Sequence, residues 1–388
     1  MRHLVLPAAF AALIACTTSA IAATEQTPAP ALTLEELQRQ LAAQQAEIDA
    51  LKAHTKAEEA EKAGRTEQTE GFGTGRSDFG GYGELHYNNL DSGSQIDFHR
   101  FVLYFAHEFD DQLRFFSEVE LEHSLAGEGK PGEVELEQAY IEYSFDSGAR
   151  VTGGLFLMPV GIINETHEPT ELYGVERNPV ESSIIPSTWW EAGAAYSGLI
   201  GDSGLKYDLA LTSGLKTDAT FNIRNGRQKV ASAVAEDLAY TARLKYSGAG
   251  GLELAASISQ QEDITQGLVP GAGGATLYTA HVMVERERFG LRALWASWDL
   301  EGSAPAAAGK DVQDGYYVEG SFKPLAKFGV FARYSVWDNG GVGVTSRTQA
   351  NYGFNWWPHQ QVVVKLDLQD QGDTVNNDGL NLGIGYRF

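Results

Sequence analysis

The sequence predicts an all-β fold, a transmembrane antiparallel β-barrel of about sixteen strands preceded by a short N-terminal coiled coil. Three observations lead to this prediction. The last residues, 378–388, alternate strictly between apolar and small or polar side chains. Similar alternating segments recur from Phe79 onward, and the breaks between them alternate between short and long. Tight periplasmic turns and longer outer loops produce this alternation in outer-membrane barrels.

The C-terminal segment shows the pattern most clearly. One face carries Leu380, Leu382, Ile384, Tyr386 and Phe388, and the other carries Asn381, Gly383, Gly385 and Arg387. Period-two alternation is typical of a strand whose two faces meet different surroundings. Since no later segment follows to cover the apolar face, we expect either lipid or another part of the barrel to cover it.

Composition supports a barrel and argues against several other classes. The chain has 388 residues, of which 21% are charged and 11% aromatic, with 43 glycines. Its mean hydropathy of -0.25 is too low for a bundle of membrane helices but suits a barrel in which every second residue faces water. The formal net charge of -23 argues against a nucleic-acid partner, because phosphate binding requires a basic surface.

The N-terminus has the features of an export signal. Arg2 precedes a short apolar run at 4–15, and small residues at 19–23 suit a cleavage site. We therefore predict a signal peptide over 1–23; a lipoprotein signal acylated at Cys16 is the alternative. No other run reaches the length of a membrane helix. Export without such a helix leaves the periplasm, the outer membrane or the exterior, and the barrel pattern selects the bacterial outer membrane.

Residues 24–55 are predicted to form a coiled-coil helix. The a and d heptad positions are Leu34, Leu37, Leu41, Gln44, Ile48 and Leu51. A single amphipathic helix is the alternative. Residues 56–78 show no periodicity and are interpreted as a linker, so that the barrel domain spans 79–388.

The predicted strands follow in order along the barrel domain. They are 79–90, 96–109, 112–123, 133–145, 149–157, 189–198, 205–213, 234–246, 252–259, 275–287, 289–300, 315–323, 326–337, 347–357, 360–369 and 380–388. In 112–123, Leu113 and Val119 share one face, while Arg114, Glu118 and Glu120 share the other. Repeated charge on the inner face predicts a wet interior, since a dry core would have to desolvate these groups. Trp190, Tyr246, Trp295 and Trp356 lie near predicted strand ends, as expected for aromatic girdles.

The break at 158–188 is the longest and carries several charged residues, prolines and apolar residues. Long loops in compact proteins are usually functional or disordered. The prolines and apolar residues favour order, so we predict that this loop folds into the lumen and narrows it. A loop that covers the outer mouth is the alternative.

Several motifs in and around this loop resemble a known family. They are Gly154-Leu155-Phe156, Pro159-Val160-Gly161, Asn164-Glu165, the run from Tyr173 to Glu181, Ile184-Ile185-Pro186 and Thr188-Trp189-Trp190-Glu191. They resemble the bacterial phosphate-selective porin O and P family, as does a coiled coil before the barrel. The resemblance implies a sixteen-stranded, trimeric outer-membrane porin whose third outer loop constricts the pore. The family's phosphate porins have a basic lumen, whereas this barrel is acidic and shows no central Lys or Arg cluster in one loop.

The candidate pore-lining and constriction residues come from the loop and from inward strand positions. In the loop they are Glu165, His167, Glu171, Glu176, Arg177 and Glu181; on the strands they are Arg100, Arg114, Glu118, Glu120, Arg243, Arg333 and Lys365. The strand cations could form a basic stripe. The carboxylates near 118–122 and 133–137 could make a mouth that attracts cations or stray divalent ions.

We expect no catalytic residues and no cofactor. We also expect no metal site, because the nine histidines are scattered without metal-ligand spacing. The leading interpretation is a passive, trimeric porin for small hydrophilic solutes or ions, embedded in outer-membrane lipid. An anion- or phosphate-selective porin is the second interpretation, and an outer-membrane enzyme or adhesin is the third.

Overall fold

The computed structural model describes residues 75–248, 250–343, 345–372 and 377–388. The predicted signal peptide, the coiled coil and nearly all of the linker lie outside these ranges. Sixteen strands lie within the described residues. They are β1 (Arg76–Leu90), β2 (Gly93–Glu108), β3 (Leu113–Glu122), β4 (Val134–Ser144), β5 (Arg150–Leu157), β6 (Trp190–Leu199), β7 (Leu205–Thr212), β8 (Ala239–Gly248), β9 (Leu252–Gln261), β10 (Ala272–Arg286), β11 (Phe289–Gly302), β12 (Val312–Leu325), β13 (Phe328–Asp338), β14 (Ser346–His359), β15 (Val362–Gly372) and β16 (Gly379–Arg387).

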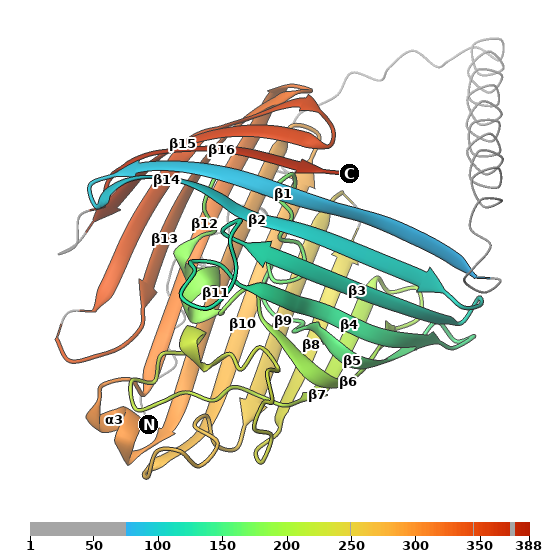
Figure 1. Cartoon of the computed structure of the whole chain (residues 1–388), viewed down its shortest axis with the longest axis vertical. Helices are drawn as coiled ribbons and strands as arrows, with labels where there is room; N and C mark the ends of the chain where they lie inside the picture. The colour runs from blue at the N-terminus through green and yellow to red at the C-terminus, as the bar shows by residue number, and fades with distance from the viewer. Residues whose placement is uncertain (1–74, 249, 344, 373–376) are drawn as a thin grey trace, which may run out of the picture. The chain divides into compact units, whose positions relative to one another are not determined.

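Each strand pairs with its sequence neighbours, and β1 pairs with β16 to close the sheet into a barrel (Figure 1). The closing pair is antiparallel and runs from Tyr82 opposite Arg387 to Leu90 opposite Gly379. Closure leaves no free sheet edge, which is required where backbone groups meet lipid. The predicted antiparallel barrel of about sixteen strands is thus confirmed, and the C-terminal segment is its last strand.

The two faces of the wall invert the usual pattern of a soluble protein. On β16, Asn381, Gly383 and Gly385 are buried on the inner side. Leu382 and Ile384 point outward and are 37% and 46% exposed. Large apolar residues lie exposed on the outer face of most of the other strands as well. An apolar outer band around a polar interior is the arrangement that a lipid bilayer stabilises.

Connections at one end of the barrel are short, and those at the other end are mostly longer. The turns at 109–112, 145–149 and 200–204 contrast with the loops at 158–189 and 213–238. Five-residue helices lie in two of the long loops: the π-helix η3 (Val180–Ile184) and α3 (Ser303–Ala307), and a shorter 3-10 helix, η4 (Arg224–Gly226), lies in another. In the part of the chain described here, no helix is both long and apolar enough to cross a membrane.

The element boundaries differ from the predictions in a few places. The barrel begins at Arg76 rather than at Phe79, because Arg76 and Ser77 already pair with Glu108 and His107 of β2. Segment 234–238 is loop, so β8 begins at Ala239. Pro324 and Pro358 lie within the ends of β12 and β14 rather than in the turns that follow them. Proline is tolerated near a strand end, where its missing N–H costs no ladder bond.

Candidate functional site

The long loop between β5 and β6 enters the lumen, as predicted, and packs there. Its residues Met158, Val160, Ile184 and Ile185 are buried among inward aromatic side chains of the wall, such as Trp298. Trp298 also donates from Nε1 to the carbonyl of Ile184 at 2.9 Å. These contacts exclude the alternative in which the loop covers only the outer mouth.

A buried carboxylate organises the base of the loop. Glu181 is 0% exposed. Its Oε2 accepts from the backbone N–H of Ile162 at 2.7 Å and of Ile163 at 2.8 Å. Its Oε1 accepts from the Tyr317 hydroxyl of β12 at 2.7 Å. Gly161 makes this approach possible, since it has φ of +70° and a Cβ there would lie 2.6 Å from Glu181 Oε2.

The middle of the loop reaches the far wall. The N–H of Val175 donates to Asp367 Oδ2 of β15 at 2.8 Å. Glu176 Oε1 lies 3.0 Å from His86 Nδ1 of β1, and Arg333 of β13 donates to the Glu176 carbonyl at 3.1 Å. The loop is therefore fixed at both sides of the lumen.

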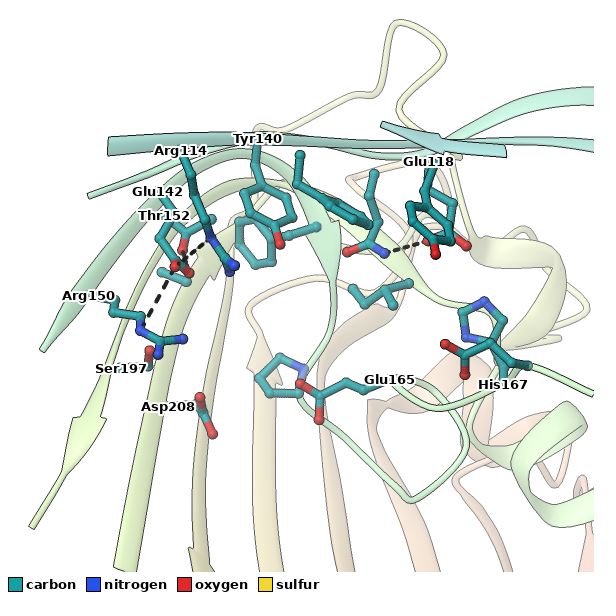
Figure 2. A pocket seen from close by; sticks show the side chains of 18 of the residues that line it. Arg114, Glu118, Tyr140, Glu142, Arg150, Thr152, Glu165, His167, Ser197 and Asp208 are labelled. Carbon is teal, nitrogen blue, oxygen red and sulfur yellow. Dashed lines mark hydrogen bonds and ion pairs between the residues drawn. The ribbon is translucent and has the colours of Figure 1, made fainter. Parts of the chain in front are cut away.

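A cavity of about 500 Å³ lies on the periplasmic side of the loop (Figure 2). Arg114 and Arg150 converge on Glu142 at its wall, with the Arg114 pair at 2.9 Å. Glu165 and His167 of the loop project into it from the opposite side. Charged groups thus line the cavity from both the wall and the loop, which keeps it hydrated.

A second cavity of about 340 Å³ lies on the outer side of the loop. One wall carries carboxylates of β3 and β4, namely Glu120, Glu122, Glu135 and Glu137. The facing wall carries cations from two loops, namely Arg177, Arg224, Arg227 and Lys229. Opposed charges across a narrow passage set up a transverse field that acts on any polar solute within it.

Two guanidinium groups of this cavity are held by backbone oxygens. Arg224 donates to the carbonyls of Ser182 and Ser187 at 2.9 and 2.7 Å, and Arg227 donates to the carbonyl of Thr188 at 2.6 Å. Among the residues that the structure describes, neither forms an ion pair within 4.0 Å. Burial and the neighbouring Arg227 lower the pKa of Arg224 to about 10, so the group stays charged at neutral pH.

The expected basic stripe along the strands is neutralised by pairing. Arg100 donates to Glu84 Oε1 at 2.6 Å, and Arg333 lies 3.4 Å from Glu319 Oε2. Arg243 forms ion pairs with Asp208 and with Glu165 of the loop. Each of these three arginines therefore has a carboxylate partner. The sequence could not reveal these partners because they come from other strands or from the loop.

Three of the residues predicted to line the pore do not lie on an open pore wall. Glu181 lies inside the folded loop, where it has no access to solvent. Glu171 is half-exposed and pairs with Arg387, near the periplasmic end, at 2.9 Å. Lys365 is buried and, with Arg333, lines a small gap of about 30 Å³ behind the loop. Similarly, Trp190 is buried at the outer cavity rather than in an aromatic girdle, whereas Trp356 is 47% exposed on the outer face.

The fold also gathers residues that the sequence analysis did not select. Arg224, Arg227 and Lys229 lie in one loop and reach the same cavity as Arg177. The sequence signal for this cluster was the close spacing of the three basic residues, at intervals of three and two positions. Nothing in the sequence indicated that this loop turns inward. The structure therefore corrects the expectation that no basic cluster lies in a single loop.

Histidine and carboxylate side chains also come together despite their scattered positions in the sequence. Three groups place ligand atoms within 4.8 Å of one another: Asp97, His99 and His123; Glu118, Glu137 and His167; and Glu122, Glu133 and Glu135. The expectation of no metal-binding arrangement rested on sequence spacing, which does not report such contacts between distant segments.

The closed barrel, its apolar outer face and the charged cavities beside an internal loop define an outer-membrane channel of the porin class. Residues 72–376 match the family Phosphate-selective porin O and P. The chain belongs to this family, as its motifs indicated, and functions as a passive channel in the bacterial outer membrane.

The chain is also similar to other proteins. An uncharacterized protein of Aquifex aeolicus (strain VF5) is 31% identical over 362 residues, covering 80% of this chain and 79% of that protein. The outer membrane channel DcaP of Acinetobacter baumannii has a TM-score of 0.59 at 13% identity, over 82% of this chain and 99% of that chain. The anion-selective porin from Comamonas acidovorans has a TM-score of 0.58 at 12% identity, over 81% and 100%. At these identities the two solved structures are evidence for the fold alone.

Proposed function

We propose that small hydrophilic solutes pass from the outer cavity to the periplasmic cavity along the wall of β3 and β4, beside the internal loop. The observation that carries this proposal is the pair of cavities on the two sides of the loop, both lined by charged side chains. Of the residues selected from the sequence, Arg100, Glu120, Glu176 and Arg177 line the outer cavity. Arg114, Glu118, Glu165 and His167 line the periplasmic cavity.

The proposed selectivity filter is the outer cavity, where carboxylates face Arg177, Arg224 and Arg227. Lys229 binds Glu133 and Glu135, so part of the acidic wall is already neutralised. Arg224 and Arg227 keep N–H groups near the cavity without an acidic partner, as described above. Although the whole chain is acidic, the local balance in this cavity is therefore less so than the composition suggests.

Anion or phosphate selectivity is a second candidate, and this arginine cluster is the specific observation in its favour. Guanidinium groups match the geometry of phosphate and carboxylate oxygens. The opposite case, a cation-selective channel, would require the β3–β4 carboxylates to dominate the electric field in the cavity. The two cases differ in the sign of the reversal potential under a salt gradient.

The experiment is the reversal potential of the purified porin in a planar bilayer under a KCl gradient. An anion-leaning reversal, together with block by millimolar phosphate, supports the arginine cluster as the filter. A cation-leaning reversal assigns that role to the carboxylates. A folded barrel that gives no channels contradicts the proposal and favours an outer-membrane enzyme or adhesin that uses its loops.

We also propose a homotrimer. OmpT of Vibrio cholerae, solved in a trimer form, has a TM-score of 0.53 to this chain at 11% identity, over 81% of this chain and 99% of that chain. Membership of the porin family supports the same assembly. Light scattering of the detergent-solubilised protein, corrected for bound detergent, tests it; a monomer mass would contradict it.

A further inference from the structure

We propose that Glu118, Glu137 and His167 form a binding site for a divalent transition-metal ion, at the point where the internal loop meets the barrel wall. Glu118 comes from β3, Glu137 from β4 and His167 from the loop. Their ligand atoms lie within 4.8 Å of one another. All three residues are buried, at 5%, 1% and 3% exposure.

Two atoms of this group face each other, and neither has a hydrogen-bond partner. Among the described residues, Glu137 Oε2 and His167 Nε2 are buried and have no hydrogen-bond partner. They lie 3.5 Å apart, which is too long for a good hydrogen bond. Leaving such groups unsatisfied is costly, so this arrangement calls for a proton or a cation between the two atoms.

The contact of the other ring nitrogen of His167 shows that Nε2 is available as a metal ligand. His167 Nδ1 lies 3.2 Å from the carbonyl oxygen of Asn164. Since a carbonyl only accepts, Nδ1 must carry the proton, and Nε2 is left free to bind a metal. In the neutral imidazole, the form that binds metals, the free Nε2 lies beside Glu137 Oε2.

A β-bulge aims the second carboxylate at the site. Glu118 lies opposite Gln138 and Val119 lies opposite Leu136, so Glu137 is the extra residue. Glu137 and Gln138 consequently both reach the interior, and Gln138 Nε2 donates to Glu118 Oε2 at 2.6 Å. Tyr82 donates to Glu118 Oε1 at 3.2 Å. Bulges occur often beside functional sites, and partners of this kind orient metal-binding carboxylates.

The other two groups fit a metal less well. Glu133 and Glu135 already hold the ammonium group of Lys229. In the third group, His123 Nδ1 pairs with Asp97 Oδ2 at 2.8 Å, and the side chains of His99 and His123 are about one-third exposed, at 36% and 32%. Only the group around His167 combines full burial with ligand atoms that lack partners, among the residues described.

One imidazole and two carboxylates favour Zn²⁺ and its neighbours in the first transition row over Ca²⁺ or Mg²⁺, which prefer oxygen ligands alone. Glu118 and His167 border the periplasmic cavity, and Glu137 borders the outer one. Water from either side can complete the coordination. A bound ion would join the loop to the wall between the two cavities.

The test is Zn²⁺ binding to the full-length porin in detergent at pH 7, measured by isothermal titration calorimetry. The wild type should bind one Zn²⁺ per chain, and His167→Gln and Glu137→Gln should each weaken binding at least about tenfold. His281→Gln is the matched control, because His281 forms an ordinary pair with Glu253 at 3.1 Å. His123→Gln tests the competing group. Neither control should change the affinity.

Absence of Zn²⁺ binding by the wild type, or loss of binding in His123→Gln, would overturn the proposal. X-ray absorption at the zinc edge needs only the wild type, so it tests the site even where a variant fails to fold. A zinc coordination shell without one imidazole would also overturn the proposal. A further expectation rests on the proposed function: Zn²⁺ should lower the conductance of the wild type but not of His167→Gln. Binding without an effect on conductance would contradict the proposed solute path and leave the metal site intact.

Discussion

Removing the carboxylate of Glu181 should release the internal loop while leaving the barrel folded. Glu181→Ala leaves three buried donors without an acceptor: the N–H groups of Ile162 and Ile163 and the hydroxyl of Tyr317. Each buried donor left unsatisfied costs about 1–3 kcal/mol. The hydroxyl can rotate toward another acceptor, so the two backbone donors remain, and we expect the free energy of loop docking to fall by about 2–6 kcal/mol.

Glu181→Gln is the matched control for this prediction. Its amide oxygen can still accept from both backbone N–H groups, and its NH2 group can donate to the Tyr317 oxygen. Only the charge assistance is lost, which should cost about 1–2 kcal/mol. The control therefore separates the carboxylate's charge from its role as an acceptor.

Two assays report the result. Single-channel recording should show a larger and noisier current for Glu181→Ala than for the wild type, with Glu181→Gln close to the wild type. Trypsin should cleave after Arg177, the only Lys or Arg in 158–188, faster in Glu181→Ala. If Glu181→Ala folds as a barrel but keeps the wild-type current and the wild-type resistance to trypsin, the carboxylate does not hold the loop and the reasoning fails.

Three further predictions concern selectivity, pH and the lipid face. Replacing Arg224 and Arg227 together by Gln should move the reversal potential under a KCl gradient toward cations by several millivolts or more; an unchanged value would place the filter elsewhere. Burial alone would raise the pKa of Glu176, but the hydrogen bond from His86 and the nearby imidazole charges outweigh it and lower the pKa from 4.5 to about 2. A lowered pKa in the folded state means that the contribution of Glu176 to loop docking is complete above pH 4.5 and is lost as the pH falls toward 2. Loop cleavage by an acid-stable protease should thus rise between pH 4.5 and 2 in the wild type, and Glu176→Gln should remove that pH step; a step of equal size in both would argue against this carboxylate. Leu382→Arg places a charge on the outward face of β16 and should reduce the free energy of folding into vesicles by about 2–4 kcal/mol, measured by urea titration; an unchanged midpoint would contradict the lipid-facing assignment.

The wall of the barrel could be predicted from the sequence because it depends on local periodicity. Leu382 and Asn381 differ in polarity, and a strand places neighbouring residues on opposite faces whatever its partners are. The alternation of short and long breaks added the topology. The motifs around 158–189 added the family and the entry of the loop into the lumen.

The arrangement inside the lumen could not be predicted in the same way. Arg243 meets both Asp208 and Glu165 because β7, β8 and the loop converge, and their separation along the chain carries no such information. The bulge at Glu137 shifts the parity of β4, so that both Glu137 and Gln138 face inward. Glu181 appears in the sequence as one more loop carboxylate, and only its burial shows that it holds the loop together.

Cysteine accessibility in the open channel tests whether solutes travel through the cavity beside the internal loop. Cys16 is the chain's single cysteine. In a chain that begins after residue 23, an introduced cysteine is therefore the sole target of a charged thiol reagent. Ser197 lines the periplasmic cavity, whereas its neighbour Tyr196 is 41% exposed on the outer face. We expect the reagent to reduce the single-channel current of Ser197→Cys and to leave that of Tyr196→Cys unchanged. Open channels of Ser197→Cys whose current the reagent does not alter would contradict this expectation.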